Sequence, residues 1–75
     1  MRVRVYLRQA LFTVPGAPHL PASAAILEGH TDEVSLDALR LQVESWADEK
    51  GRSLEGASVD LVLPASKIDH VVVLS

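Results

Sequence analysis

The first extended segment of the sequence carries side chains that could bind nucleic acid. In RVRVYLR, residues 2–8, Arg2, Arg4, Tyr6 and Arg8 alternate with apolar residues. In a strand these four side chains project from one face at intervals of about 6.6 to 7 Å, which suits contacts with successive phosphates. Tyr6 could stack on a base. The competing interpretation is a solvated sheet face, in which arginine stems cover apolar surface and their charged heads lie in water.

Charge distribution bears on the choice between these interpretations. We add Lys67 and His70 to the candidate binding surface, but the net charge of −3 is unlike that of a general nucleic-acid binder. Residues 2–8 hold three arginines and no acid, whereas residues 28–37 hold four acids and no Lys or Arg. Segments of opposite charge on identical chains can pair head to tail, so self-association is the second hypothesis for this stripe.

Histidines next to acids are the candidate metal ligands. His30 lies near Asp32 and Glu33, and His70 follows Asp69. Imidazole and carboxylate groups suit zinc or manganese. Neighbouring strand residues point to opposite faces, so we expect that Asp69 and His70 do not share an ion, whereas His30 and Asp32 can. Two ligands are too few, and we predict neither a metal site nor a cofactor.

The sequence offers little for catalysis. It has no cysteine, no G-x-S-x-G nucleophile elbow and no glycine-rich phosphate loop. A chain of 75 residues with a filled core also leaves little room for a pocket of about 300 Å³ or more. We therefore predict that the protein is not an enzyme and has no catalytic residues.

Length and composition indicate one small domain spanning residues 1–75. A chain of this size buries only about 60% of its unfolded surface, and it has no disulfide to stabilise it, so we expect a homo-oligomer. No apolar run approaches the roughly 18 residues that a membrane helix needs. Arg8 interrupts the N-terminal segment before a signal-peptide core develops. These features predict a cytoplasmic protein without a membrane partner.

Alternating apolar residues predict the elements that position these side chains. The apolar pattern changes parity near Arg8-Gln9, which predicts a bulge or bend there. PGAPHLP, residues 15–21, must be an exposed connection. The continuous apolar run at residues 71–74 predicts burial on both faces. The predicted strands lie near residues 2–8, 24–31, 38–46, 58–63 and 69–74.

The segment SLDALRLQVESWADEKG fits two templates. A strand explains Leu39 and Leu41 but leaves Trp46 out of phase, whereas a helix places Trp46 on its apolar face and leaves Leu41 outside. DEKG, residues 48–51, has the composition of a hairpin turn with glycine at positive φ, and this favours the strand. The alternative is a ββαββ domain with a helix at about residues 35–50. As the only Trp, Trp46 is expected in the core or at a subunit interface.

Read as strands, the sequence from Leu27 onward resembles the Sm-like small β-barrel family. That family has a glycine in a bent strand, then an apolar residue, an acid and an L-x-L strand. LEGHTDEVSLDALRLQV contains these features in order, at Gly29, Val34, Asp37, Leu39 and Leu41. VDLVLPASKIDHVVVL then supplies a strand, a short turn and a final apolar strand. The resemblance spans residues 27–74, about two-thirds of the 75 residues.

The resemblance implies the fold more than the function of the family. Pro64 to Lys67 would form a 3₁₀ turn, and Ile68 would plug the barrel. Sm-like proteins carry an asparagine after the acid that reads a base, and an Arg-Gly or Lys-Gly pair in the final turn. This chain has no asparagine, and ASK stands in that turn.

The expected protein is an all-β, five-stranded small barrel that does not catalyse a reaction. Its expected role is self-assembly, or interaction with another protein, through an exposed edge strand. The alternative function is binding of RNA or single-stranded nucleic acid. The side chains assigned to that function are Arg2, Arg4, Tyr6, Arg8, Lys67 and His70.

Overall fold

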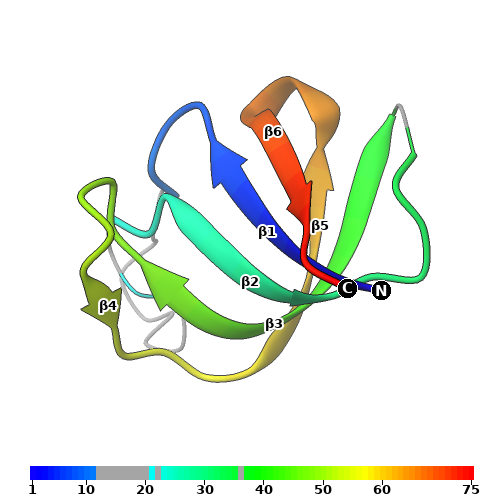
Figure 1. Cartoon of the computed structure of the whole chain (residues 1–75). Helices are drawn as coiled ribbons and strands as arrows, with labels where there is room; N and C mark the ends of the chain where they lie inside the picture. The colour runs from blue at the N-terminus through cyan, green and yellow to red at the C-terminus, as the bar shows by residue number, and fades with distance from the viewer. Residues whose placement is uncertain (12–20, 22, 36) are drawn as a thin grey trace.

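A computed structural model describes residues 1–11, 21, 23–35 and 37–75 of the chain, and the structural statements below concern these residues (Figure 1). They form six strands and one short 3₁₀ helix, η1, with no α-helix among them. The helix predicted as the alternative at residues 35–50 is therefore wrong, because a long strand covers most of that segment. In chain order the elements are β1 (Arg2–Leu7), β2 (Ile26–His30), β3 (Ala38–Ala47), β4 (Ser53–Leu54), β5 (Val59–Pro64), η1 (Ala65–Lys67) and β6 (Ile68–Val73).

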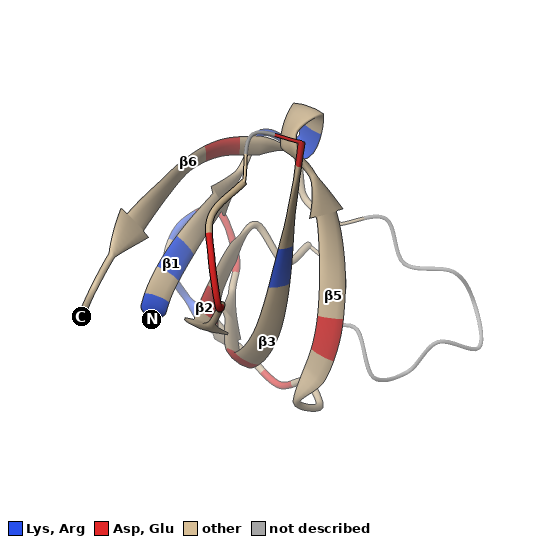
Figure 2. Ribbon diagram, turned by 90° about the vertical axis from the view of Figure 1, so that its right-hand side faces the viewer, with Lys and Arg blue, Asp and Glu red and all other residues tan. Residues whose placement is uncertain are grey.

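All strand pairs are antiparallel, in the order β4-β3-β2-β1-β6, and β5 pairs with the first half of β3. The sheet is strongly curved. Figure 2 shows β5 and β6 meeting at η1 and then diverging, with the other strands between them. No hydrogen-bonded ladder joins β5 to β6 in the described part of the chain. The predicted all-β antiparallel fold is confirmed, but six strands form an open sheet rather than five strands closed by hydrogen bonds.

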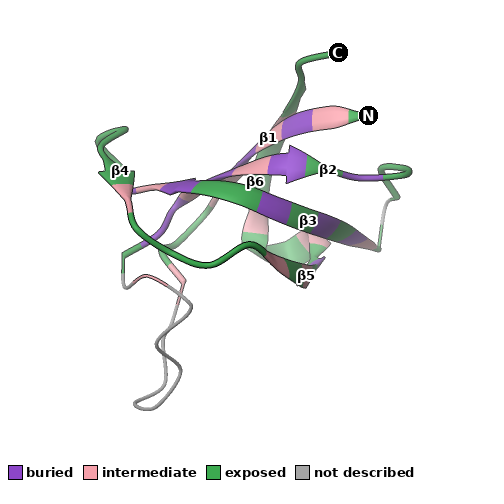
Figure 3. Cartoon of the chain, turned by 90° about the horizontal axis from the view of Figure 1, so that it is seen from below, coloured by how far each residue is buried: buried purple, intermediate pink, exposed green. Residues whose placement is uncertain are grey.

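The core lies on the concave side of the curved sheet. Strand alternation produces it, because every second residue of β1 and of the first half of β3 points inward. In Figure 3 buried residues alternate with half-buried ones along β1 and with exposed ones along the first half of β3. A cluster this small leaves several neighbouring apolar side chains only half-buried. The buried cluster consists of Val3, Val5, Ala24, Leu27, Leu39, Leu41, Val43, Trp46 and Leu63.

A bulge in β3 reconciles Trp46 with the strand. Glu28 pairs with Ser45 whereas Gly29 pairs with Val43, so Glu44 is an extra residue on β3. The extra residue changes the alternation, and Trp46 faces the core with 3% of its surface exposed. The close approach at this point requires glycine, because a Cβ on Gly29 would lie 1.9 Å from the backbone oxygen of Gln42.

Two predicted turns are present. After β3 the chain reverses through Asp48 to Gly51, and Gly51 has a φ of 83°, which glycine adopts without strain. The Asp48 carboxylate accepts hydrogen bonds from the backbone N–H groups of Lys50 at 3.0 Å and Arg52 at 2.9 Å. The predicted 3₁₀ turn is η1, which joins β5 to β6.

The predicted burial of residues 71–74 on both faces is wrong for a single chain. Val72 is 38% exposed, Val73 is 58% exposed and Leu74 is 37% exposed, because β6 has a neighbouring strand on one side only. Val62, on β5, is 68% exposed. Of the proline-rich connection predicted at residues 15–21, only Pro21 lies within the described residues. No helix in the described residues is long and apolar enough to cross a membrane.

Candidate functional site

The two N-terminal arginines are paired with acids of the same chain. Arg4 lies opposite Glu28 in the β1–β2 register. One Glu28 oxygen lies 2.8 Å from Nη2 of Arg2, and the other lies 3.2 Å from Nε of Arg4. The Arg2 guanidinium, and after it that of Arg4, lowers the pKa of the Glu28 carboxyl. This part of the stripe is therefore neutralised within the chain by an acid of segment 28–37.

Glu44 extends the same charged cluster across the sheet. Its Oε1 lies 3.3 Å from Nη1 of Arg2 and 2.9 Å from Nε2 of His30. Glu44 is the extra residue of the β3 bulge, and so the bulge that turns Trp46 inward also adds an acid beside Arg2. Sequence reasoning did not find Glu44, because strand alternation alone does not locate a bulge.

Tyr6 is stacked on a histidine of the neighbouring strand. Its ring lies 4.4 Å from the ring of His70, centroid to centroid, with an interplanar angle of 11°. Tyr6 and His70 are also partners in the β1–β6 register. One face of the tyrosine is thus covered by His70, which leaves less of the ring available for stacking on a base.

Asp69 and His70 lie on the same side of their strand, contrary to the expectation from alternation. Tyr6 pairs with His70 and Leu7 pairs with Ile68, so Asp69 is an extra residue of a bulge in β6. Because a bulge interrupts alternation, the two side chains meet, with Oδ2 of Asp69 2.6 Å from Nδ1 of His70. The bulge or bend predicted near Arg8-Gln9 is confirmed, because the chain bends at these two residues and the register with β6 shifts between Tyr6 and Leu7.

The remaining two predicted residues lie together at the η1 end of the sheet. Arg8 and Lys67 line one hollow of about 360 Å³. The Arg8 backbone N–H donates to the Lys67 carbonyl at 2.9 Å, and Arg8 Nε donates to the Ile68 carbonyl at 3.1 Å. The six predicted binding residues therefore lie in three places: Arg2 and Arg4 at Glu28, Tyr6 against His70, and Arg8 with Lys67. The first two places are connected, because a side-chain hydrogen bond with Tyr6 raises the pKa of Arg4.

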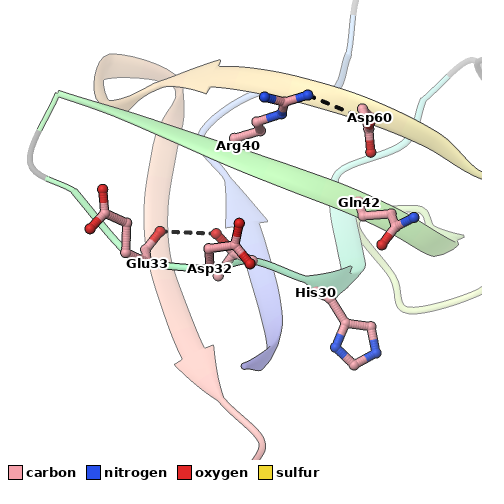
Figure 4. A pocket seen from close by; sticks show the side chains of 7 residues that line it. His30, Asp32, Glu33, Arg40, Gln42 and Asp60 are labelled. Carbon is pink, nitrogen blue, oxygen red and sulfur yellow. Dashed lines mark hydrogen bonds and ion pairs between the residues drawn. The ribbon is translucent and has the colours of Figure 1, made fainter.

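A larger open pocket of about 500 Å³ contains the first metal-ligand candidates (Figure 4). The expectation that so short a chain leaves little room for a pocket above about 300 Å³ is therefore wrong, because the curved open sheet leaves hollows on its surface. His30, Asp32 and Glu33 line it, together with the ion pair of Arg40 and Asp60, whose closest atoms are 3.8 Å apart. The imidazole of His30 extends away from the two neighbouring carboxylates in Figure 4. Its Nε2 lies 2.9 Å from Oε1 of Glu44 instead. In the part of the chain that is described, no group of three or more acids and histidines could hold a metal ion.

Comparisons with known proteins do not assign any of these features. No family model, curated protein or solved structure matches this chain. A function must therefore be inferred from the sheet edges and from the side-chain contacts of the predicted binding residues.

Proposed function

We propose that this chain is a non-catalytic, Sm-like small β-barrel domain that assembles with further copies of itself through β5 and β6. The Sm-like interpretation is supported by the bulged strand at Gly29, by the L-x-L pattern of β3 and by the 3₁₀ turn that leads into the final strand. The observation that carries the self-assembly is the exposed apolar surface on two unpaired sheet edges.

The three edge strands differ in how well they can accept a further strand. β4 has only two residues, and Arg52 and Glu55 flank it, which makes it a short and charged edge. β5 and β6 have six residues each, and each is hydrogen-bonded on one side only in the described sheet. A long unpaired strand leaves a row of N–H and C=O groups available for another chain.

Apolar side chains accumulate on these two edges. Of the six large exposed hydrophobic residues in the described part of the chain, four lie on β5 or β6 or directly after β6: Val62, Val72, Val73 and Leu74. Burying such side chains gains about 25 cal/mol for each Å² removed from water. The apolar run at the end of the chain predicts burial on both faces, and a second chain would supply the face that one copy lacks.

We infer that β5 of one copy pairs with β6 of the next. β5 and β6 have six residues each. If β5 of every copy pairs with β6 of the next, a single type of contact covers both the β5 edge and the β6 edge. Pairing β6 with β6 would leave β5 exposed. A contact between different surfaces repeats from copy to copy, so it produces a closed ring or a filament.

The test is the mass of the protein in solution, measured by sedimentation over a range of concentrations. The wild-type chain should exceed the 8.1 kDa of one copy. Val62→Lys on β5 and Val72→Lys on β6 should each yield monomers, because a buried unpaired charge opposes the contact. Val34→Lys is the matched control, since Val34 is a half-exposed valine in the β2–β3 connection rather than on β5 or β6, and it should assemble like wild type.

Mixing the two edge variants tests the pairing itself. The Val62→Lys chain keeps an intact β6 edge and the Val72→Lys chain keeps an intact β5 edge, so an equal mixture should form dimers and nothing larger. A wild-type chain that stays monomeric would refute self-assembly. Assembly of the Val62→Lys chain by itself would refute the β5–β6 contact.

A further inference from the structure

We propose that the hollow at the η1 end of the sheet, lined by Arg8 and Lys67, binds a phosphate group of a nucleotide or of a single-stranded nucleic acid. The hollow has a volume of about 360 Å³, within the usual range of ligand pockets, about 300 to 1,000 Å³. This site is distinct from the β5 and β6 edges, and it does not depend on self-assembly.

The unpaired positive charge of the molecule is concentrated here. Four of the seven Lys and Arg residues form ion pairs with acids, namely Arg2, Arg4, Arg40 and Arg52. All ten acids of the chain are among the described residues, and none lies within ion-pair distance of Arg8, Lys50 or Lys67. Two of these three cations line the same hollow, whereas Lys50, in the β3–β4 turn, lines a neighbouring pocket that shares only Ala10 with it.

The backbone positions the guanidinium of Arg8. Its Nε donates to the carbonyl of Ile68 at 3.1 Å, and its own N–H donates to the carbonyl of Lys67 at 2.9 Å. In the described residues no acceptor is bonded to Nη1 or Nη2, so these groups can donate to a ligand. A guanidinium held in one orientation suits the paired oxygens of a phosphate.

Neutral donors complete a set that fits phosphate. Gln9 and Ser66 line the hollow beside the two cations, and they contribute an amide and a hydroxyl. Ala10 and Leu11 supply an apolar part of the lining that can contact the sugar and base of a nucleotide. Guanidinium, ammonium, hydroxyl and amide donors together match the several acceptor oxygens of one phosphate group.

Three probes separate the sources of the phosphate: inorganic phosphate, a mononucleotide, and a short fluorescein-labelled single-stranded RNA. Binding of the first two is followed by shifts of backbone amide resonances, which should be largest at residues 8, 9, 66 and 67. Binding of the RNA is followed by fluorescence anisotropy. Shifts with the mononucleotide assign a free nucleotide, and binding of the RNA alone assigns nucleic acid.

Charge variants test the assignment to this hollow. Arg8→Gln and Lys67→Gln should each lower the affinity for whichever probe binds by at least tenfold. If loss of the hydrogen bond from Arg8 to the Ile68 carbonyl perturbs folding, Lys67→Gln alone provides the test. Lys50→Gln is the matched control because it removes an equal charge elsewhere, and its affinity should stay within twofold of wild type. Val62→Lys should bind like wild type, since the site does not need assembly.

The salt dependence of RNA binding gives a second measure. One neutralised phosphate predicts a slope of about −0.7 in log affinity against log salt, and loss of the ammonium in Lys67→Gln should make the slope shallower. Failure of all three probes to shift these resonances or to bind would overturn the proposal. An equal loss of affinity in Lys50→Gln would also overturn it, because the binding would then reflect net charge alone.

Discussion

Glu28 and Arg4 face each other across the β1–β2 ladder, with Oε2 of the acid 3.2 Å from Nε of the arginine. The other oxygen of Glu28 contacts Arg2, so one carboxylate neutralises two members of the N-terminal basic stripe. The stripe that an alternating sequence predicts as one continuous surface is therefore divided. Its first half is an internal ion-pair cluster, and only Arg8 retains a charge without an acidic partner among the described residues.

Removal of the Glu28 charge should lower stability in a pH-dependent way. The pKa of Glu28 is lowered in the folded chain, chiefly by Arg2. Its contribution is complete above the unfolded value of about 4.3 and is lost as the pH falls through the lower folded value. Glu28→Gln should therefore be less stable than wild type at pH about 7, and the difference should shrink as the pH falls below about 4.

The free energies of unfolding of wild type and Glu28→Gln, measured with denaturant at pH about 7 and at pH below about 4, test this prediction. Glu55→Gln is the control, because Glu55 is exposed and takes part in no ion pair among the described residues. A deficit of the Glu28 variant that is equal at both pH values would show that its charge is not the cause.

Gly29→Ala should be among the most damaging single substitutions in the sheet. The new Cβ would lie 1.9 Å from the backbone oxygen of Gln42, and a paired strand cannot move away without breaking the ladder. We expect a loss of about 3 kcal/mol or more in the free energy of unfolding. Gly51→Ala is the matched comparison: it has open space but a φ of 83°, and it should cost only about 1 to 2 kcal/mol. Equal losses would contradict the close approach at Gly29.

Asp48→Ala should loosen the turn between β3 and β4. The Asp48 carboxylate accepts hydrogen bonds from the backbone N–H groups of Lys50 and Arg52. These bonds lower the pKa of Asp48, and the bond from the Arg52 backbone is the largest cause. In the variant, hydrogen exchange at the backbone amides of Lys50 and Arg52 should accelerate. Exchange at the amides of β1, which lies in the core of the sheet, should change less. Unchanged exchange at Lys50 and Arg52 would show that the backbone alone maintains the turn.

Trp46 reports on the integrity of the core. The side chain is almost fully buried, and its Nε1 donates to the Ala57 carbonyl at 3.1 Å. The only tryptophan of the chain should therefore emit at short wavelength and shift to longer wavelength on unfolding. Trp46→Phe removes the hydrogen bond and part of the packed volume, and it should cost about 1 to 3 kcal/mol, measured by circular dichroism. Solvent-like emission from the folded protein would contradict this burial.

Five of the six strands were predicted to within about two residues at each end, whereas β4 and the partners of the candidate site were not. Alternation of apolar residues depends on neighbours two positions apart, and it placed β3 at residues 38–46 where the structure has Ala38–Ala47. The positive φ of Gly51 likewise follows from a residue type that adopts this conformation without strain, whereas the 3₁₀ turn after Pro64 was implied by the resemblance to Sm-like proteins. The pairing of Glu28 with Arg4 depends on the register of two strands separated by a long connection, and that register has no local signature.

The bulges mark the same limit. An extra residue at Glu44 turns Trp46 into the core, and an extra residue at Asp69 brings its carboxylate to His70, although alternation predicts opposite faces. Both bulges are set by how two strands fit across the sheet.

The sequence by itself determined the apolar alternation, the turns and four of the strands, because these depend on conformational preferences of short segments. That residues 38–47 form a strand rather than a helix was decided by the structure. Only the tertiary structure decided which charges of RVRVYLR are neutralised, which one remains with Lys67, and which strand edges stay open. Those outcomes depend on contacts between residues far apart in the chain, where curvature, register and bulges select the neighbours.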